Sequence, residues 1–294
     1  MRVKYLTLIA AIILLAGCTN DIDTTTTGTA EVTVKVSDFA VAQTELPSSK
    51  TRTAVEDYEA LKALTLAFYK SDGTEVYKYT QLKDDGSTYT TFGVFTCSLP
   101  MGSYTMVVIG RAVSAGDVLN LTSATSAEYT SDHVRETFAT TQTVNVNTNA
   151  ALNLSAELER VIAKVQVVST DLRTADVSNI RMTFSAGSKG FNPTTGLATT
   201  NTGFANTLQG HGAVGSTTTA TSYLFLASDP QTVNITIETL DALGNTLFSK
   251  VVEDVPLKRN RLTTLTGAMY TNTGVSGSGF TVNTEWLTGN SVDF

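Results

Sequence analysis

Residues 31–36 read EVTVKV, and this short stretch decides the fold. Valines at positions 32, 34 and 36 alternate with the polar residues Glu31, Thr33 and Lys35. Successive side chains of a β-strand point to opposite faces, so a period of two places the three valines on one face. The stretch therefore predicts a first strand whose apolar face packs against a core.

The same alternation recurs along the chain between turn signals. Asp72-Gly73 separates two strand-like runs, and the sequence from Asp241 to Asn245 separates two more. Such signals recur about every ten residues, a spacing typical of β-sandwiches. Charged residues make up only 16% of the chain, so threonine, serine and asparagine must supply much of the polar surface. Threonine is β-branched and favours strands. The sequence predicts an all-β protein.

The length of 294 residues exceeds that of one ordinary core and indicates two domains. We expect a signal peptide over 1–17, a flexible tether over 18–30, an N-terminal β-sandwich over 31–156 and a C-terminal one over 157–294. Residues 185–221 are rich in glycine, threonine and asparagine and read as a long functional or mobile loop. We expect a short helical turn near residues 127–134.

The first eighteen residues have the layout of a secretory signal. Basic Arg2 and Lys4 precede an apolar run that is too short to span a bilayer. The run ends in Leu15-Ala16-Gly17-Cys18, which resembles the bacterial lipobox, where a peptidase cuts before a cysteine that carries a diacylglyceryl group. We expect cleavage between Gly17 and Cys18, and anchoring in the outer membrane through the Cys18 sulfur. The other cysteine, Cys97, then lacks a partner and should be a buried, inert thiol.

Composition and motifs argue against several functional classes. The net charge of −7 and the scattered basic residues disfavour nucleic-acid binding. The two histidines, His133 and His211, have no acidic or thiol partner at ligand spacing, so we expect no metal and no cofactor. No nucleophile elbow, phosphate-binding loop or metalloprotease motif is present in the sequence. The sequence therefore predicts a protein that is not an enzyme.

Several motifs in order give the chain a family resemblance. They are KTRTA at 50–54 before LTLAFYKSDG at 64–73, LPMGSY at 99–104, the strand-like run 158–168, and VPLKRNRLTTLTG at 255–267. Together with the lipobox, they resemble the Bacteroidetes fimbrillin superfamily, which comprises subunits, anchors and tip proteins of type V pili. The resemblance spans residues 18–294.

The resemblance implies two tandem transthyretin-like β-sandwiches and assembly by donor-strand exchange with other fimbrial subunits. A strand from one subunit then fills a groove in its neighbour. In such pilins an arginine-specific protease cuts after an arginine in the loop that follows the first strand, and Arg52 stands at the corresponding place. Anchor subunits instead keep the first strand and the lipid. The implied role is structural and adhesive, on the cell surface or in a fimbria.

The C-terminal stretch 280–286 is the candidate donor strand, with Phe280, Val282 and Trp286 on one face. The alternative is a last strand that pairs within its own domain. A different function is also open, namely a surface glycan-binding lipoprotein of a nutrient-uptake system. Trp286 and Tyr223 are candidate sugar platforms for that function, although the alternation around Trp286 favours a place in the core.

Mass spectrometry of the mature protein tests the lipid anchor. We expect the chain to start at Cys18 with a diacylglyceryl group on its sulfur, because each buried CH₂ contributes about 0.8 kcal/mol to membrane binding. Cys18→Ser should lose the modification and move from the membrane fraction to the soluble fraction. An unmodified N-terminus downstream of Cys18 would contradict the expectation.

Overall fold

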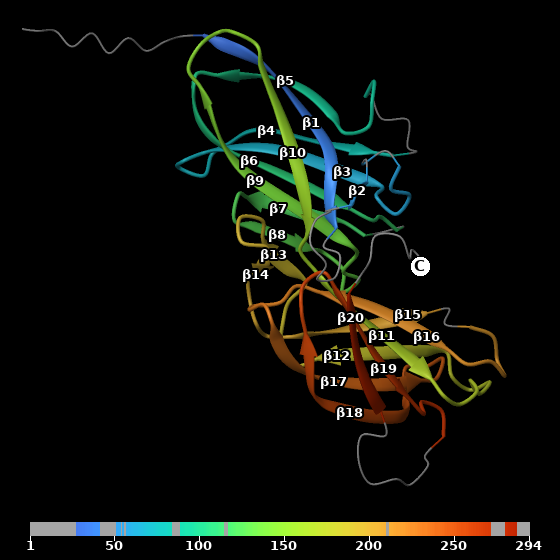
Figure 1. Ribbon diagram of the computed structural model, residues 1–294. Helices are drawn as coiled ribbons and strands as arrows, with labels where there is room; N and C mark the ends of the chain where they lie inside the picture. The colour runs from blue at the N-terminus through green and yellow to red at the C-terminus, as the bar shows by residue number, and fades with distance from the viewer. Residues whose placement is uncertain are drawn as a thin grey trace, which may run out of the picture.

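The computed structural model describes residues 28–41, 51–53, 55, 57–83, 89–114, 117–209, 212–271 and 280–286 (Figure 1). Within these residues every regular element is a β-strand, which confirms the all-β prediction and shows the helical turn expected near 127–134 to be wrong. Nothing in these ranges forms a helix long and apolar enough to cross a membrane.

The strands of the N-terminal half are β1 (Thr29–Val41), β2 (Thr51–Thr53), β3 (Ala63–Lys70), β4 (Glu75–Leu82), β5 (Val94–Pro100), β6 (Gly102–Arg111), β7 (Leu119–Ser123), β8 (Ser126–Tyr129), β9 (Thr137–Val146) and β10 (Leu152–Arg160). Those of the C-terminal half are β11 (Ala163–Ser169), β12 (Asn179–Phe184), β13 (Gly190–Asn192), β14 (Leu197–Ala198), β15 (Phe204–Gln209), β16 (Thr219–Leu224), β17 (Gln231–Leu240), β18 (Thr246–Leu257), β19 (Arg261–Gly267) and β20 (Phe280–Trp286).

One large sheet folds over itself to make the N-terminal sandwich. Its strand order is β2-β1-β10-β9-β6-β3-β4, and β5 pairs with β1 outside this path. Strands β1 and β10 cross in front of β9, β6, β3 and β4, so the sheet forms two layers (Figure 1). The layers are joined through a short β9–β10 pairing at Ala139 and Phe138. The core between them includes alternate residues of β1 and of β3, among them Leu64, Leu66 and Phe68.

Two four-stranded sheets form the C-terminal sandwich. Their orders are β16-β11-β19-β20 and β15-β12-β17-β18. Val165 and Leu265 from the first sheet pack in one core cluster with Met182 and Ile235 from the second. The passage from the first half to the second lies at residues 161–162, because β10 ends at Arg160 and β11 begins at Ala163.

A fourth sheet bridges the two halves. Its order is β14-β13-β8-β7, and Phe191 of β13 pairs with Ala127 of β8. The aromatic ring of Phe191 stacks on Phe225 with centroids 4.3 Å apart, and Tyr129 lies on the other side of Phe225 at 6.4 Å. The sequence expectation of one long loop over 185–221 is therefore wrong. Strands β13, β14 and β15 fall within it. Strand β13 pairs with β8 of the other half and β15 pairs with β12, and local patterning does not reveal these distant partners.

A buried ion pair lies where the halves meet. Arg160 Nε donates to Glu136 Oε1 at 2.7 Å, and both side chains are only 4% exposed. The Tyr58 hydroxyl donates to the same carboxylate at 3.0 Å, and Arg160 also donates to Asn260 in the C-terminal half. The Arg160 guanidinium lies 4.9 Å from the centre of the Phe138 ring. Each charge is thus compensated by several partners, as a buried pair requires.

Arg160→Ala tests this junction. It should lower the free energy of unfolding by about 3–5 kcal/mol, because the substitution leaves the Glu136 carboxylate buried without its cation. Urea denaturation measures the loss.

The matched control is Arg181→Ala. Arg181 pairs with Glu238 at 2.7 Å, but its side chain is 33% exposed, so this loss should stay within about 1 kcal/mol. Equal losses of unfolding free energy in the two variants would show that the buried pair at the junction stabilises the protein no more than an exposed pair does.

Candidate functional site

The first strand lies in a slot between two others. Residues 32–40 of β1 pair in parallel with β10, and residues 29–35 pair antiparallel with β5. Val32 thus lies between Leu152 of β10 and Cys97 of β5, and Val34 lies between Leu154 and Phe95. An interior strand satisfies backbone groups on both of its edges, so β1 completes the ladders of two neighbours at once.

The slot is also closed by side chains. Val32 and Val34 are fully buried and Val36 is 2% exposed, whereas Glu31 and Lys35 point to solvent. This is the alternation expected from the sequence. Burying one valine side chain contributes about 1.5–3 kcal/mol, so the three together account for a substantial part of the stability of this half.

Cys97 lines the slot opposite Val32. It is a free thiol, 9% exposed, which confirms the expectation of a buried, unpaired cysteine. Burial raises its pKa to about 11. The thiolate, which is the reactive form, is therefore scarce at neutral pH, and the residue is inert while β1 stays in place.

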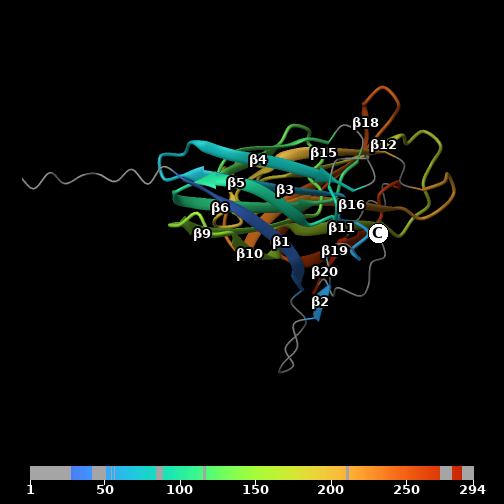
Figure 2. The ribbon, with the colours of Figure 1, turned by 90° about the horizontal axis from the view of Figure 1, so that it is seen from above.

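Arg52 lies in β2, a three-residue strand that pairs with the end of β1, where Arg52 is opposite Ala40. The sequence placed Arg52 in a loop, whereas the backbone is extended here. The strand lies beyond the body of the sheet, beside the far end of β1 (Figure 2). In the described chain β2 pairs with β1 alone and is an edge strand. Gly17 and Cys18, the expected cleavage and lipidation positions, lie outside the described residues.

The candidate donor strand, β20, is paired in its own half. It runs antiparallel to β19 and forms an edge of its sheet, with Phe280 opposite Gly267 and Trp286 opposite Arg261. Phe280 is 8% exposed, but Val282 is 42% exposed. The side chain of Val282 therefore lies partly in solvent, although it alternates with Phe280. The core position expected for Trp286 stays a prediction, because its side chain lies outside the part of the chain that the structure describes.

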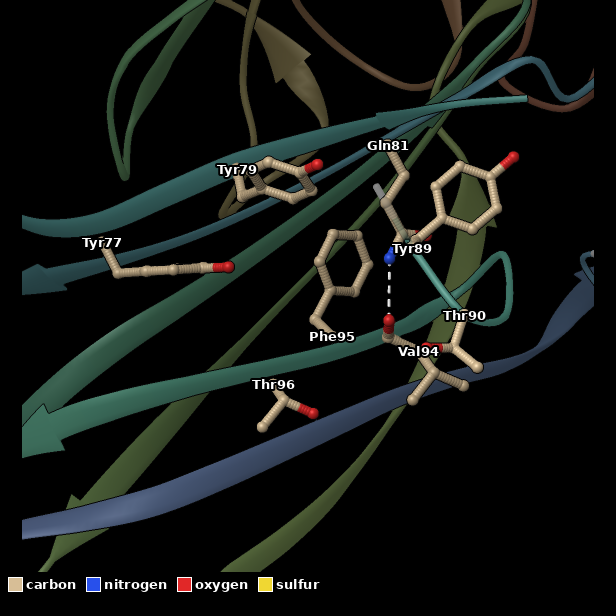
Figure 3. Close-up of a pocket in the computed structure, with 8 residues that line it drawn as sticks. All are labelled: Tyr77, Tyr79, Gln81, Tyr89, Thr90, Val94, Phe95 and Thr96. Carbon is tan, nitrogen blue, oxygen red and sulfur yellow. Dashed lines mark hydrogen bonds between the residues drawn. The ribbon is translucent and has the colours of Figure 1, made fainter. Parts of the chain in front are cut away.

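A hollow that sequence reasoning missed lies between β4 and β5. It is lined by Tyr77, Tyr79, Gln81, Tyr89, Thr90, Val94, Phe95 and Thr96, and we name it the tyrosine pocket (Figure 3). The sequence did hold one signal for this hollow, namely the alternation of Tyr77, Tyr79 and Gln81 along one strand, which places these side chains on the same face. The expected sugar platform Tyr223 is instead half-buried and packs against the core between the halves. Among the described residues no cluster of three potential metal ligands is present.

Solved structures from Bacteroides and Porphyromonas species are similar to this chain. A candidate adhesin from Bacteroides ovatus is 12% identical with a TM-score of 0.51, and the comparison covers 89% of this chain and 96% of that one. A candidate polysaccharide-binding protein from Bacteroides thetaiotaomicron is 8% identical with a TM-score of 0.50, covering 86% and 96%. The fimbrial anchor protein Mfa2 from Porphyromonas gingivalis is 12% identical with a TM-score of 0.49, covering 86% and 95%.

These likenesses show the fold, and the expected resemblance to fimbrillin-like proteins is confirmed at that level. No curated protein sequence matches the chain. A family of unknown function, DUF6562, matches residues 24–286. The match takes in both sandwiches and the sheet that bridges them, and the chain belongs to this family.

Proposed function

We propose that the chain is a non-catalytic structural subunit or anchor of a cell-surface fimbria and that it assembles by donor-strand exchange. The observation that carries this proposal is the position of β1. An N-terminal strand provides Val32, Val34 and Val36 to the core and pairs with both β10 and β5. The fold-sharing adhesin candidate supports an adhesive role on the cell surface.

The topology makes β1 removable by a single cut. All residues of β1 precede Arg52, and every other strand of the sandwich except the short β2 follows it. Cleavage after Arg52 would release the lipid on Cys18, the tether and β1 as one piece. The remaining sandwich would keep β10 and β5 with an apolar groove between them.

Such a groove selects an extended segment with alternating apolar residues. The backbone edges of β10 and β5 would supply hydrogen bonds on both sides, and the vacated valine positions would supply apolar pockets. A second copy can provide this segment through β20, where Phe280, Val282 and Trp286 alternate with polar residues as the valines of β1 do. Strand β20 is an edge strand held by β19 alone in the described chain, so it can leave without breaking two ladders.

Two roles follow from one molecule. If Arg52 is cut, the chain is a shaft subunit that has left the membrane. If Arg52 is spared, β1 stays in its slot and the lipid on Cys18 holds the chain to the outer membrane as an anchor.

The reactivity of Cys97 reports whether β1 leaves. In a Cys18→Ser chain, Cys97 is the only thiol and a maleimide should label it very slowly, because burial protects it and raises its pKa. Treatment with an arginine-specific protease should make labelling fast, because release of β1 removes Val32, which covers Cys97 in the intact chain. Polymerisation should restore protection because a donor strand covers the same face.

The matched control is Arg52→Lys, which keeps the charge but removes the cleavage point. This variant should stay unlabelled after protease treatment. Fast labelling of the uncut chain, or continued protection after β1 has been removed, would argue against the proposal.

Val282→Asp tests the donor strand. Because Val282 is 42% exposed in the single chain, the substitution should change folding stability by no more than about 0.5 kcal/mol. In a partner's apolar groove the new carboxylate would be buried without a cation, which is strongly unfavourable. We expect secretion of a folded chain that forms no fibres in electron micrographs.

Leu243→Asp serves as the control, since Leu243 is 88% exposed in the turn between β17 and β18. It introduces the same charge outside the donor strand and should assemble normally. Fibres of normal length from Val282→Asp would exclude β20 as the donor.

A further inference from the structure

The tyrosine pocket lies on the open side of the N-terminal sandwich. Strand β4 pairs only with β3 and β5 pairs only with β1 in the described chain, so these two edges face one another without forming a ladder. The hollow between them has a volume of about 320 Å³. That volume is within the range of pockets that hold small organic ligands.

The Gln81 side chain closes one end of this gap. Its Nε2 donates to Val94 O at 2.7 Å, and its Oε1 accepts from the Gly93 amide at 2.8 Å. Gly93 has a φ of +90°, and a Cβ there would lie 2.8 Å from Val55 Cγ2, so only glycine fits this close approach. The bridge blocks an extended peptide from running through the gap. What is left is a compact pocket and not a groove.

Each tyrosine of the pocket is held by a buried phenylalanine. Ring centroids are 6.4 Å apart for Tyr77 and Phe68, 6.5 Å for Tyr79 and Phe95, and 5.7 Å for Tyr89 and Phe92. Figure 3 shows Tyr77 and Tyr79 projecting from β4 toward Phe95, with Tyr89 at the Gln81 end. These contacts fix the rings before any ligand arrives, which lowers the entropy cost of binding.

The lining is neutral and rich in hydroxyl groups. None of the eight residues carries a formal charge, and burial raises the pKa of Tyr77, which keeps that phenol protonated. Thr90 and Thr96 are exposed. The hydroxyls of Tyr77, Tyr89, Thr90 and Thr96 have no hydrogen-bond partner within the described part of the chain. They can therefore both donate to a ligand and accept from it.

We propose that the tyrosine pocket binds one or two units of a neutral glycan. The faces of aromatic rings carry partial negative charge and attract the C–H groups on the apolar side of a pyranose. Sugar hydroxyls match the free hydroxyls of the lining. An anionic ligand would find no cation among the lining residues, and a purely apolar one would leave these hydroxyls unsatisfied. The pocket belongs to the single folded chain, so binding does not depend on fibre assembly.

Two tyrosine substitutions test the pocket on a glycan array. The full chain, as a Cys18→Ser soluble protein, is applied to printed neutral and sialylated glycans, and the strongest neutral oligosaccharide is then titrated by calorimetry. Tyr77→Ala and Tyr89→Ala should each raise its Kd about tenfold or more, since removing an anchoring aromatic ring typically costs that much. Tyr89→Phe keeps the ring and should weaken binding less than Tyr89→Ala.

Tyr270→Ala is the matched control, because it removes a half-buried tyrosine from the C-terminal half. It should bind like the wild type. Circular dichroism checks that each variant is folded, and Tyr89→Phe keeps the test informative if an alanine variant unfolds. Absence of neutral glycan binding by the wild type, binding of sialylated glycans alone, or equal affinity in the folded Tyr77 and Tyr89 variants would overturn the proposal.

Discussion

The N-terminal half depends on a strand that the chain supplies first. Strand β1 fills a slot between β10 and β5, and its valines complete the core between the two layers. Its partner β10 comes more than one hundred residues later in sequence, so the slot exists only after the whole half has been made. A long loop must be closed before this parallel pairing can form, so placing β1 beside β10 carries a loop-closure entropy cost.

Two kinds of contact join the halves, namely strand pairing and a buried ion pair. Strands β13 and β8 connect them through backbone pairing, with stacked Phe191 and Phe225 packed alongside. Arg160 and Glu136 connect them through a buried ion pair that reaches Asn260. A buried pair is sensitive to geometry, so it favours one relative arrangement of the sandwiches. Force applied at one end of such a chain would therefore pass through a packed junction.

The open edges of the sheets are where the molecule can meet others. Edge strands are a liability for soluble proteins, and the chain leaves β20 and β2 at edges, each with a single partner in the described chain. The edges of β4 and β5 differ from these, because the Gln81 side chain bridges the gap between the two strands with hydrogen bonds. The first kind of edge suits strand exchange, whereas the second leaves a pocket of fixed shape.

Local alternation and turn chemistry were enough to predict the all-β class, the first strand and the burial of its valines, because a period of two reports directly which face is apolar. The lipobox is likewise a local signal, and it stays a prediction because Cys18 lies outside the described residues. Local sequence patterns could not predict which strands pair with one another. The sequence predicted a loop over residues 185–221, whereas β13 within this range pairs with β8. It also placed Arg52 in a loop, whereas β2 pairs with β1. The exposure of Val282, the junction pair and the tyrosine pocket were decided by the tertiary structure, because each depends on which distant strands come to lie side by side.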